Sequence, residues 1–264
     1  MLFDRKQKFI FIAVIIALFG AGGVFLFLAG IPSFLSFFAP SQEFQPIAPT
    51  PTASKPPVLP AVAVVPPYRG EAVAAVAADP QFLKQVLPET DRAFRAELAD
   101  IAKNLAVNPN QPPFWFRVAY IKHFYNDDTG ARDAYEYLNI IDSNNPLPFY
   151  NLALLYGYNL KEPANAEVKF EAAIARNPLD PGYYIGFADF YREVMRDLPS
   201  AEQTLLAGLS KIDSTDFYIA LGALYKTMGN KTKAIQYYSG ALSWKDLGSA
   251  ERQAITDEVA RLKQ

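Results

Sequence analysis

Cysteine is absent from the chain, and histidine occurs once, at position 123. Without cysteine there are no thiol nucleophiles, thiolate metal ligands or disulfide bonds. A single imidazole excludes a pair of histidines on a metal, and nothing in the sequence pattern points to the partners that a Ser-His-Asp triad would need. We therefore expect no catalytic residue, no metal site and no cofactor. A structural or solvent-facing role is expected for His123, with metal binding by neutral imidazole as the alternative.

Signals for nucleotide or nucleic-acid binding are also missing. The sequence has no Gly-x-x-x-x-Gly-Lys-Ser/Thr loop after a strand. The one cluster of glycines, between positions 20 and 23, lies in an apolar run. Residues 70–264 carry 20 Lys and Arg against 25 Asp and Glu, a net charge of −5, without a basic stripe. Nucleic acid is therefore not an expected partner, and we expect the protein not to be an enzyme.

What the chain does contain first is a long apolar run, Phe9–Ala29, of 21 residues without a charge. At about 1.5 Å per residue, this run covers a hydrocarbon core of roughly 30 Å. It is longer than the apolar part of a signal peptide and no small-x-small cleavage site closes it, so a transmembrane helix is favoured over a cleaved signal. Three basic residues precede the run and none follows it before Lys55, which predicts a cytoplasmic N-terminus.

These features divide the N-terminal part of the chain into three segments. Residues 1–8 are a basic cytoplasmic N-terminus, residues 9–38 a transmembrane helix with an interfacial extension, and residues 39–69 a Pro-rich linker. Two Pro-x-x-Pro motifs in the linker, at 46–49 and 57–60, suit partner domains that bind such segments, but a spacer is the favoured interpretation. We expect a single-pass protein of a bacterial inner membrane, with the rest of the chain periplasmic or extracellular.

Helical periodicity dominates the remainder, most clearly in residues 218–242, YIALGALYKTMGNKTKAIQYYSGAL. Apolar residues recur at three and four positions on both sides of a Met-Gly-Asn turn, which predicts a helical hairpin. The motif that carries the pattern is Tyr218-x2-Leu221-Gly222-x2-Tyr225, followed by Ala234-x3-Tyr238. This motif resembles the tetratricopeptide repeat, with Tyr in place of the family's Trp and Phe, and Asp246 where the closing Pro would fall.

The same pattern recurs upstream at nearly the period of about 34 residues that the resemblance requires. The aromatic residue that closes each first helix recurs at spacings of 35 and 34: Tyr156, Tyr191 and Tyr225. The alanine that opens each second helix recurs at spacings of 35 and 33: Ala166, Ala201 and Ala234. An earlier unit within 114–146 fits in either of two registers, one on Tyr125, Ala134 and Leu138, the other on Trp115-x2-Val118-Ala119.

The predicted fold is therefore an all-α, tetratricopeptide-like solenoid of helical hairpins, preceded by a single N-terminal transmembrane helix. Residues 70–109 are predicted to be an N-terminal helical cap or a degenerate repeat, with Thr90 as the cap of a longer helix. Residues 110–246 hold the repeats. Residues 247–264 hold a C-terminal capping helix with a polar outer face.

The resemblance implies a concave groove, lined by the first helix of each repeat, that takes a peptide or a helix. Transferred to this chain, the groove positions are Tyr150, Leu154, Tyr158, Ile185, Asp189, Arg192, Ile219 and Lys226. These side chains are aromatic and aliphatic at one end and mixed in charge at the other, which suits an apolar or amphipathic partner. The Lys and Asn clamp of chaperone-binding members of the family is not matched.

The function predicted from the sequence is a membrane-tethered scaffold or adaptor that binds a peptide or helix of a partner protein. A membrane-anchored chaperone or substrate-capture subunit of a secretion or assembly machine is the alternative, and an enzyme or enzyme accessory that uses His123 is a third. The inverted orientation also stays open, with the repeats in the cytosol as in mitochondrial outer-membrane import receptors. Nothing in the sequence identifies the partner.

Overall fold

The computed structural model describes residues 67, 68 and 72–264. The predicted N-terminus, transmembrane helix and extension (1–38) and nearly all of the linker (39–69) lie outside the described residues. The described residues form helices and no strand, which confirms the all-α prediction for this part of the chain. None of these helices is both long enough and apolar enough to cross a membrane.

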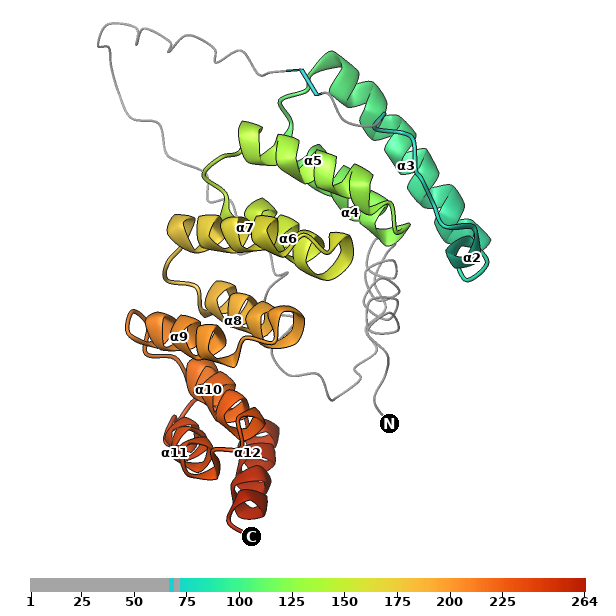
Figure 1. Cartoon of the computed structure of the whole chain (residues 1–264). Coiled ribbons are helices and arrows are strands. Elements are labelled where there is room, and N and C mark those ends of the chain that lie inside the picture. Colours follow the sequence, from blue (N-terminus) through green and yellow to red (C-terminus); the bar gives the residue numbers. More distant parts are fainter. Residues whose placement is uncertain (1–66, 69–71) are drawn as a thin grey trace, which may run out of the picture. The chain divides into compact units, whose positions relative to one another are not determined.

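Two helices, α2 (Pro80–Leu83) and α3 (Pro88–Val107), come before a series of helical hairpins. The hairpins pair α4 (Pro112–Phe124) with α5 (Asp128–Ile141), α6 (Pro146–Leu154) with α7 (Pro163–Arg176), α8 (Pro181–Phe190) with α9 (Leu198–Leu209), and α10 (Thr215–Thr227) with α11 (Lys231–Leu242). Two first helices end in π-helical turns, η2 (Leu155–Leu160) and η3 (Tyr191–Met195), and α12 (Ser249–Leu262) follows the last hairpin. Consecutive hairpins stack, with α6, α8 and α10 along one side and α7, α9 and α11 along the other (Figure 1).

The helix α3 begins earlier than expected. Leu87 stands at its N-cap position without a side-chain capping hydrogen bond, and Pro88 is its first residue, so the prediction that Thr90 caps this helix is wrong. Proline has φ fixed near −65° and lacks the N–H that would stay unpaired in a first turn, so it starts a helix well without a polar cap.

The turns inside the four hairpins share one geometry. Each contains one residue with positive φ: Asn126 (61°), Lys161 (61°), Arg196 (59°) and Gly229 (73°). The backbone N–H of the following residue donates to the carbonyl of the residue that closes the first helix: Lys122, Tyr156, Tyr191 and Tyr225. A left-handed residue at this point ends the first helix and reverses the chain direction.

This shared turn decides the register of the first repeat. Asp127 donates its N–H to the Lys122 carbonyl at 2.9 Å, as Asn230 does to the Tyr225 carbonyl at 2.9 Å. Lys122 therefore occupies the position that is tyrosine in the other repeats, and the register on Trp115 is the correct one. The hydrophobic pattern did not indicate this register, because lysine is rarely fully buried in proteins. Lys122 is nevertheless fully buried here.

The π-helical turns explain why the repeat spacings are unequal. From the closing tyrosine to the left-handed residue there are five positions in the second and third hairpins (156 to 161 and 191 to 196) but four in the fourth (225 to 229). The additional residue is accommodated within the helix as η2 and η3, where the hydrogen bonds run from i to i+5. The shorter fourth turn accounts for one of the two residues by which the alanine spacing falls from 35 to 33, and the tyrosine spacing, which falls from 35 to 34, accounts for the other.

The hydrophobic core passes from one hairpin to the next. Phe170 of α7 is fully buried, and its ring centroid lies 4.9 Å from that of Phe187 and 5.4 Å from that of Phe190, both in α8. Glycine allows the closest approach of rings: a Cβ added at Gly208 would lie 2.4 Å from the Phe217 ring. Each hairpin therefore buries its apolar surface against its neighbours, as in repeat proteins generally.

Candidate functional site

The predicted groove residues lie on the first helices of the second, third and fourth hairpins. Tyr150, Leu154 and Tyr158 belong to α6 and η2, Ile185, Asp189 and Arg192 to α8 and η3, and Ile219 and Lys226 to α10. All are half-buried except Lys226, which is exposed. These residues therefore lie at the boundary between the packed helices and the solvent, on helices that Figure 1 shows along one side of the stack.

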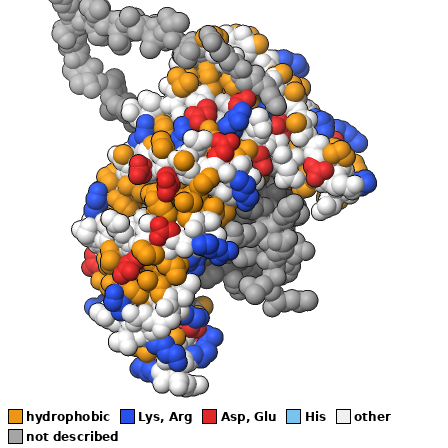
Figure 2. Space-filling model, viewed as in Figure 1, with side chains coloured by type: hydrophobic (Ala, Val, Ile, Leu, Met, Phe, Trp, Pro, Cys, Tyr) orange, Lys and Arg blue, Asp and Glu red, His pale blue; other side chains and the backbone are white. Residues whose placement is uncertain are grey.

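Charge is distributed unequally between the two sides of the second hairpin. The first helix with its π-helical turn, residues 146–160, contains no charged residue, whereas α7 contains four and the neighbouring α5 also contains four. On the face shown in Figure 2, charges of both signs are mixed with hydrophobic side chains. Helix α6 with η2, which carries three of the predicted groove residues, is thus uncharged and lies between charged helices.

Tyr150 bridges α6 and α8. Its ring centroid lies 5.1 Å from that of Tyr183 and 5.8 Å from that of Phe170. The ring passes over Gly186, where an added Cβ would lie 2.1 Å from the tyrosine hydroxyl. Burial raises the pKa of the Tyr150 hydroxyl, and the nearby Asp189 carboxylate raises it further. Tyr150 is therefore a fixed part of the wall between two hairpins, with its hydroxyl directed at α8.

Leu154 and Tyr158 continue this wall toward the end of the same helix. The Tyr158 hydroxyl donates to Glu193 Oε2 at 3.4 Å, and its ring centroid lies 6.5 Å from that of Phe190. Leu154, four residues from each tyrosine, is half-buried. The π-helical turn lets Tyr158 reach the next hairpin, and it adds Glu193 to the site, a residue that sequence reasoning missed because a 3.6-residue period does not describe this turn.

The charged end of the predicted site is internally paired. The Arg192 guanidinium donates through Nη2 to Asp189 Oδ1 at 2.5 Å and to Glu193 Oε1 at 3.3 Å. Ile185, one turn before Asp189, packs against the core formed with the third and fourth hairpins. We call the six residues of these two hairpins the α6–α8 surface: Tyr150, Leu154, Tyr158, Ile185, Asp189 and Arg192.

The two remaining predicted residues face α12. Lys226 Nζ lies 2.6 Å from Glu258 Oε1, and the hydrogen bond from Lys226 lowers the pKa of that carboxyl. Ile219 packs against the cluster that contains Ile255 and Val259 of α12. The contacts described for Ile219 and Lys226 are thus with α12, and their place in a groove stays a prediction.

His123, the only histidine, lies in the last turn of α4. Its Nδ1 is 2.8 Å from Asp128 Oδ1, a residue of the first turn of α5. Asp128 also accepts a hydrogen bond from the Asn159 amide at 3.2 Å. Among the described residues no group of three histidine or carboxylate side chains could hold a metal ion. The contacts of His123 thus link the two helices of the first hairpin to the second hairpin.

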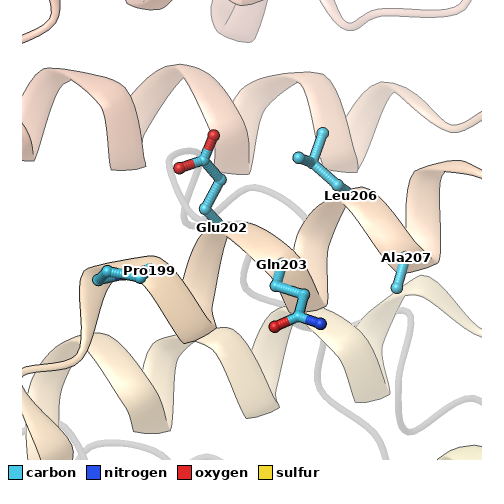
Figure 3. Close-up of a pocket in the computed structure, with 5 residues that line it drawn as sticks. All are labelled: Pro199, Glu202, Gln203, Leu206 and Ala207. Atoms are coloured by element: carbon cyan, nitrogen blue, oxygen red, sulfur yellow. The ribbon is translucent and has the colours of Figure 1, made fainter.

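A shallow cleft lies on the outer side of the stack. It is lined by five residues of α9: Pro199, Glu202, Gln203, Leu206 and Ala207. Figure 3 shows Glu202 and Leu206 pointing to one side of α9 and Gln203 and Ala207 to the other. A second cleft shares Gln203 and Ala207 and extends to α7. None of the predicted groove residues lines either cleft, although the second cleft also includes Tyr184, Phe187 and Tyr191 of α8 and η3.

The chain was compared with proteins of known function and known structure. No curated protein matches the chain. Among solved structures, MamA is 20% identical over 64% of this chain and 95% of its own, with a TM-score of 0.48. PilW, described as a widely conserved type IV pilus biogenesis factor, is 16% identical over 69% and 83%, with a TM-score of 0.49. YrrB, described as a protein with an unusual peptide-binding site, is 19% identical over 59% and 79%, with a TM-score of 0.44.

Sequence similarity is more specific than these structural similarities, and it falls on the hairpin with the clearest motif. A family model described as the tetratricopeptide repeat matches residues 215–246, the segment that begins with α10 and contains α11. The described part of the chain is thus an all-helical solenoid of tetratricopeptide-like hairpins, of which residues 215–246 match the tetratricopeptide repeat in sequence.

Proposed function

We propose that the protein is a membrane-tethered scaffold or adaptor that binds a peptide or helix of a partner protein on the α6–α8 surface. The observation that carries the proposal is the uncharged helix over 146–160. It holds Tyr150, Leu154 and Tyr158, all three half-buried. Tyrosine is among the residues that contribute most of the binding energy in protein interfaces, and charged residues are depleted at the core of such interfaces.

The chemistry of this surface favours an amphipathic helix as the ligand. Leu154 and Ile185 offer aliphatic contacts, which suit apolar residues spaced by three and four on a partner helix. The carboxylates of Asp189 and Glu193 already bond to Arg192, so this end is polar and nearly balanced in charge. A partner helix with an apolar stripe and a polar edge therefore matches the surface better than a strongly charged peptide.

A charge placed on the α6–α8 surface tests the proposal. Leu154→Lys is expected to lower the binding of the partner about tenfold or more, because an unpaired ammonium would be buried in an apolar contact. A photocrosslinking residue at position 185 in living cells measures this through the yield of one defined adduct. Val168→Lys on α7, where the side chain is 61% exposed on the outer side, is the matched control and should leave the yield unchanged.

The identity of the crosslinked species decides between the proposed functions. One dominant adduct that Leu154→Lys removes supports a scaffold. Adducts with many unfolded or translocating chains would support the chaperone or substrate-capture alternative. Equal adduct yields from the Leu154→Lys chain and the parent chain would contradict binding at the α6–α8 surface altogether.

Membrane tethering is a separate part of the proposal and rests on the apolar run Phe9–Ala29, which three basic residues precede and none follows before Lys55. With the repeats periplasmic, added protease is expected to digest residues 72–264 in spheroplasts, whose outer barrier has been removed. Protection of the repeats until the inner membrane is lysed would show the inverted orientation. Recovery of the whole chain in the soluble fraction of lysed cells would contradict the anchor.

A further inference from the structure

The first hairpin differs from the others in what contacts the residue that closes its first helix. In the second and fourth hairpins a tyrosine at this position donates to a glutamate on the second helix of the preceding hairpin, Tyr156 to Glu136 at 2.8 Å and Tyr225 to Glu202. The first hairpin has Lys122 there. Its ammonium donates to the backbone carbonyl of Ala75 at 2.5 Å, in the segment before α2. We call residues 72–79 the strap.

Lys122 acts together with a carboxylate. Asp127 Oδ2 lies 3.1 Å from Lys122 Nζ and accepts the backbone N–H of Ala77 at 3.3 Å. Its other oxygen accepts the N–H of Gly130 at 3.0 Å, which fixes the carboxylate at the start of α5. The two charged side chains are 0% and 1% exposed. The hairpin thus presents one buried donor and one buried acceptor side by side.

This pair contacts the main chain of the strap. In an extended chain the carbonyl of residue i and the N–H of residue i+2 face the same side, which is how Ala75 and Ala77 meet Lys122 and Asp127. The side chains of both alanines are exposed. These two hydrogen bonds therefore do not depend on the strap's own side chains, and another extended segment with small side chains could form them equally well.

Little apolar burial holds the strap in place. After a turn closed by the hydrogen bond from Ala75 N–H to the Ala72 carbonyl, residues 75–79 form no helix or strand, and no strap residue is fully buried. Upstream, the Tyr68 ring lies 4.5 Å from Trp115 and 5.4 Å from Tyr137, measured between centroids. Segments with few buried contacts open at low free-energy cost, so the strap can exchange with a competitor.

We propose that the Lys122–Asp127 pair is a peptide site that recognises main chain, that the strap is its intramolecular ligand, and that an extended segment with small side chains from a partner protein can replace the strap. The site lies on the first hairpin and its residues are separate from those of the α6–α8 surface. It would add to the protein a second contact of a different kind, made through backbone rather than through apolar side chains.

The test uses the full-length chain and a labelled synthetic peptide with the strap sequence, AVAAVAAD. Ala77→Pro removes the strap N–H that Asp127 accepts and so weakens the internal competitor. Because a hydrogen bond to a charged group is lost, the peptide should bind this chain about tenfold more tightly than the parent chain, measured by fluorescence anisotropy. Ala78→Pro is the matched control, since Ala78 N–H makes none of the bonds described, and should leave the affinity near that of the parent.

Two further measurements test whether the peptide is bound through its main chain and at this site. A peptide that is N-methylated at the position of Ala77 lacks the required N–H and should bind the Ala77→Pro chain at least tenfold more weakly than the unmodified peptide. Tyr150→Ala should leave peptide binding unchanged, so failure at this site is distinguishable from failure of the α6–α8 surface. Equal affinity of the methylated and unmodified peptides, or no gain in the Ala77→Pro chain, would overturn the assignment.

Discussion

Lys122→Met is expected to lower the free energy of unfolding by about 3–5 kcal/mol, a large part of the roughly 5–15 kcal/mol of a typical domain. The substitution leaves the carboxylate of Asp127 buried beside an apolar side chain, since both partners of this pair are almost fully shielded from solvent. Removing one member of a buried ion pair costs more than the pair contributes, because the remaining charge cannot be hydrated. Urea denaturation followed by circular dichroism measures the loss.

Two companion variants identify the cause of that loss. In Lys122→Met combined with Asp127→Asn no charge remains, and the asparagine can still accept the Gly130 N–H at the start of α5. This double variant should recover most of the stability that the single variant loses. Lys103→Met removes a lysine whose pair with Asp100 is 78% and 72% exposed, and should change little. A Lys122→Met chain as stable as Lys103→Met would refute the account of the buried pair.

Phe170→Ala should have an effect of similar size, about 3–5 kcal/mol, for a different reason. The Phe170 ring fills the space between the second and third hairpins, in contact with Phe187, Phe190 and Tyr150. Alanine would leave a cavity that helices of two hairpins cannot both close. Denaturation by urea measures the total loss, and hydrogen exchange should increase most in α6, α7 and α8, where the contacts between hairpins are broken.

The control for this substitution lies two residues away on the same helix. Val168 is 61% exposed on the outer side of α7, so Val168→Ala should change the free energy of unfolding by no more than about 0.5 kcal/mol. Both variants shorten an apolar side chain in α7, so helix propensity does not explain a difference between them. Similar losses for the two variants would show that Phe170 does not couple the hairpins.

The best-patterned hairpin could be predicted from the sequence because its interactions are local. Residues 218–242 show three-and-four spacing, a glycine turn and small residues at helix contacts, and the structure forms α10 and α11 there with the turn at Gly229. The same periodicity identified the hairpins upstream. A helix needs only hydrogen bonds between near neighbours and one apolar face, so its pattern is visible within a window of a dozen residues.

The candidate site was less predictable, because its geometry depends on neighbours distant in sequence. Sequence spacing placed Ile219 and Lys226 with Tyr150, but it gave no sign that α12 contacts both. Spacing also did not reveal Glu193, which the π-helical turns and the Tyr158 contact bring into the site. Whether a half-buried residue meets solvent, another helix or a counter-charge is set by packing between elements, which periodicity does not encode.

By itself the sequence determined the helical class, the repeat period and the position of the best-patterned hairpin, since these follow from local spacing and turn residues. Tertiary structure alone decided the register of the first repeat, the burial of Lys122 against Asp127 and the main-chain contact with Ala75. From the sequence, a lysine on a helix is predicted to be solvated. Lys122 can be buried only because the fold places a carboxylate and a backbone carbonyl beside its ammonium group. That pairing joins residues up to 47 positions apart, so only the folded chain brings them together.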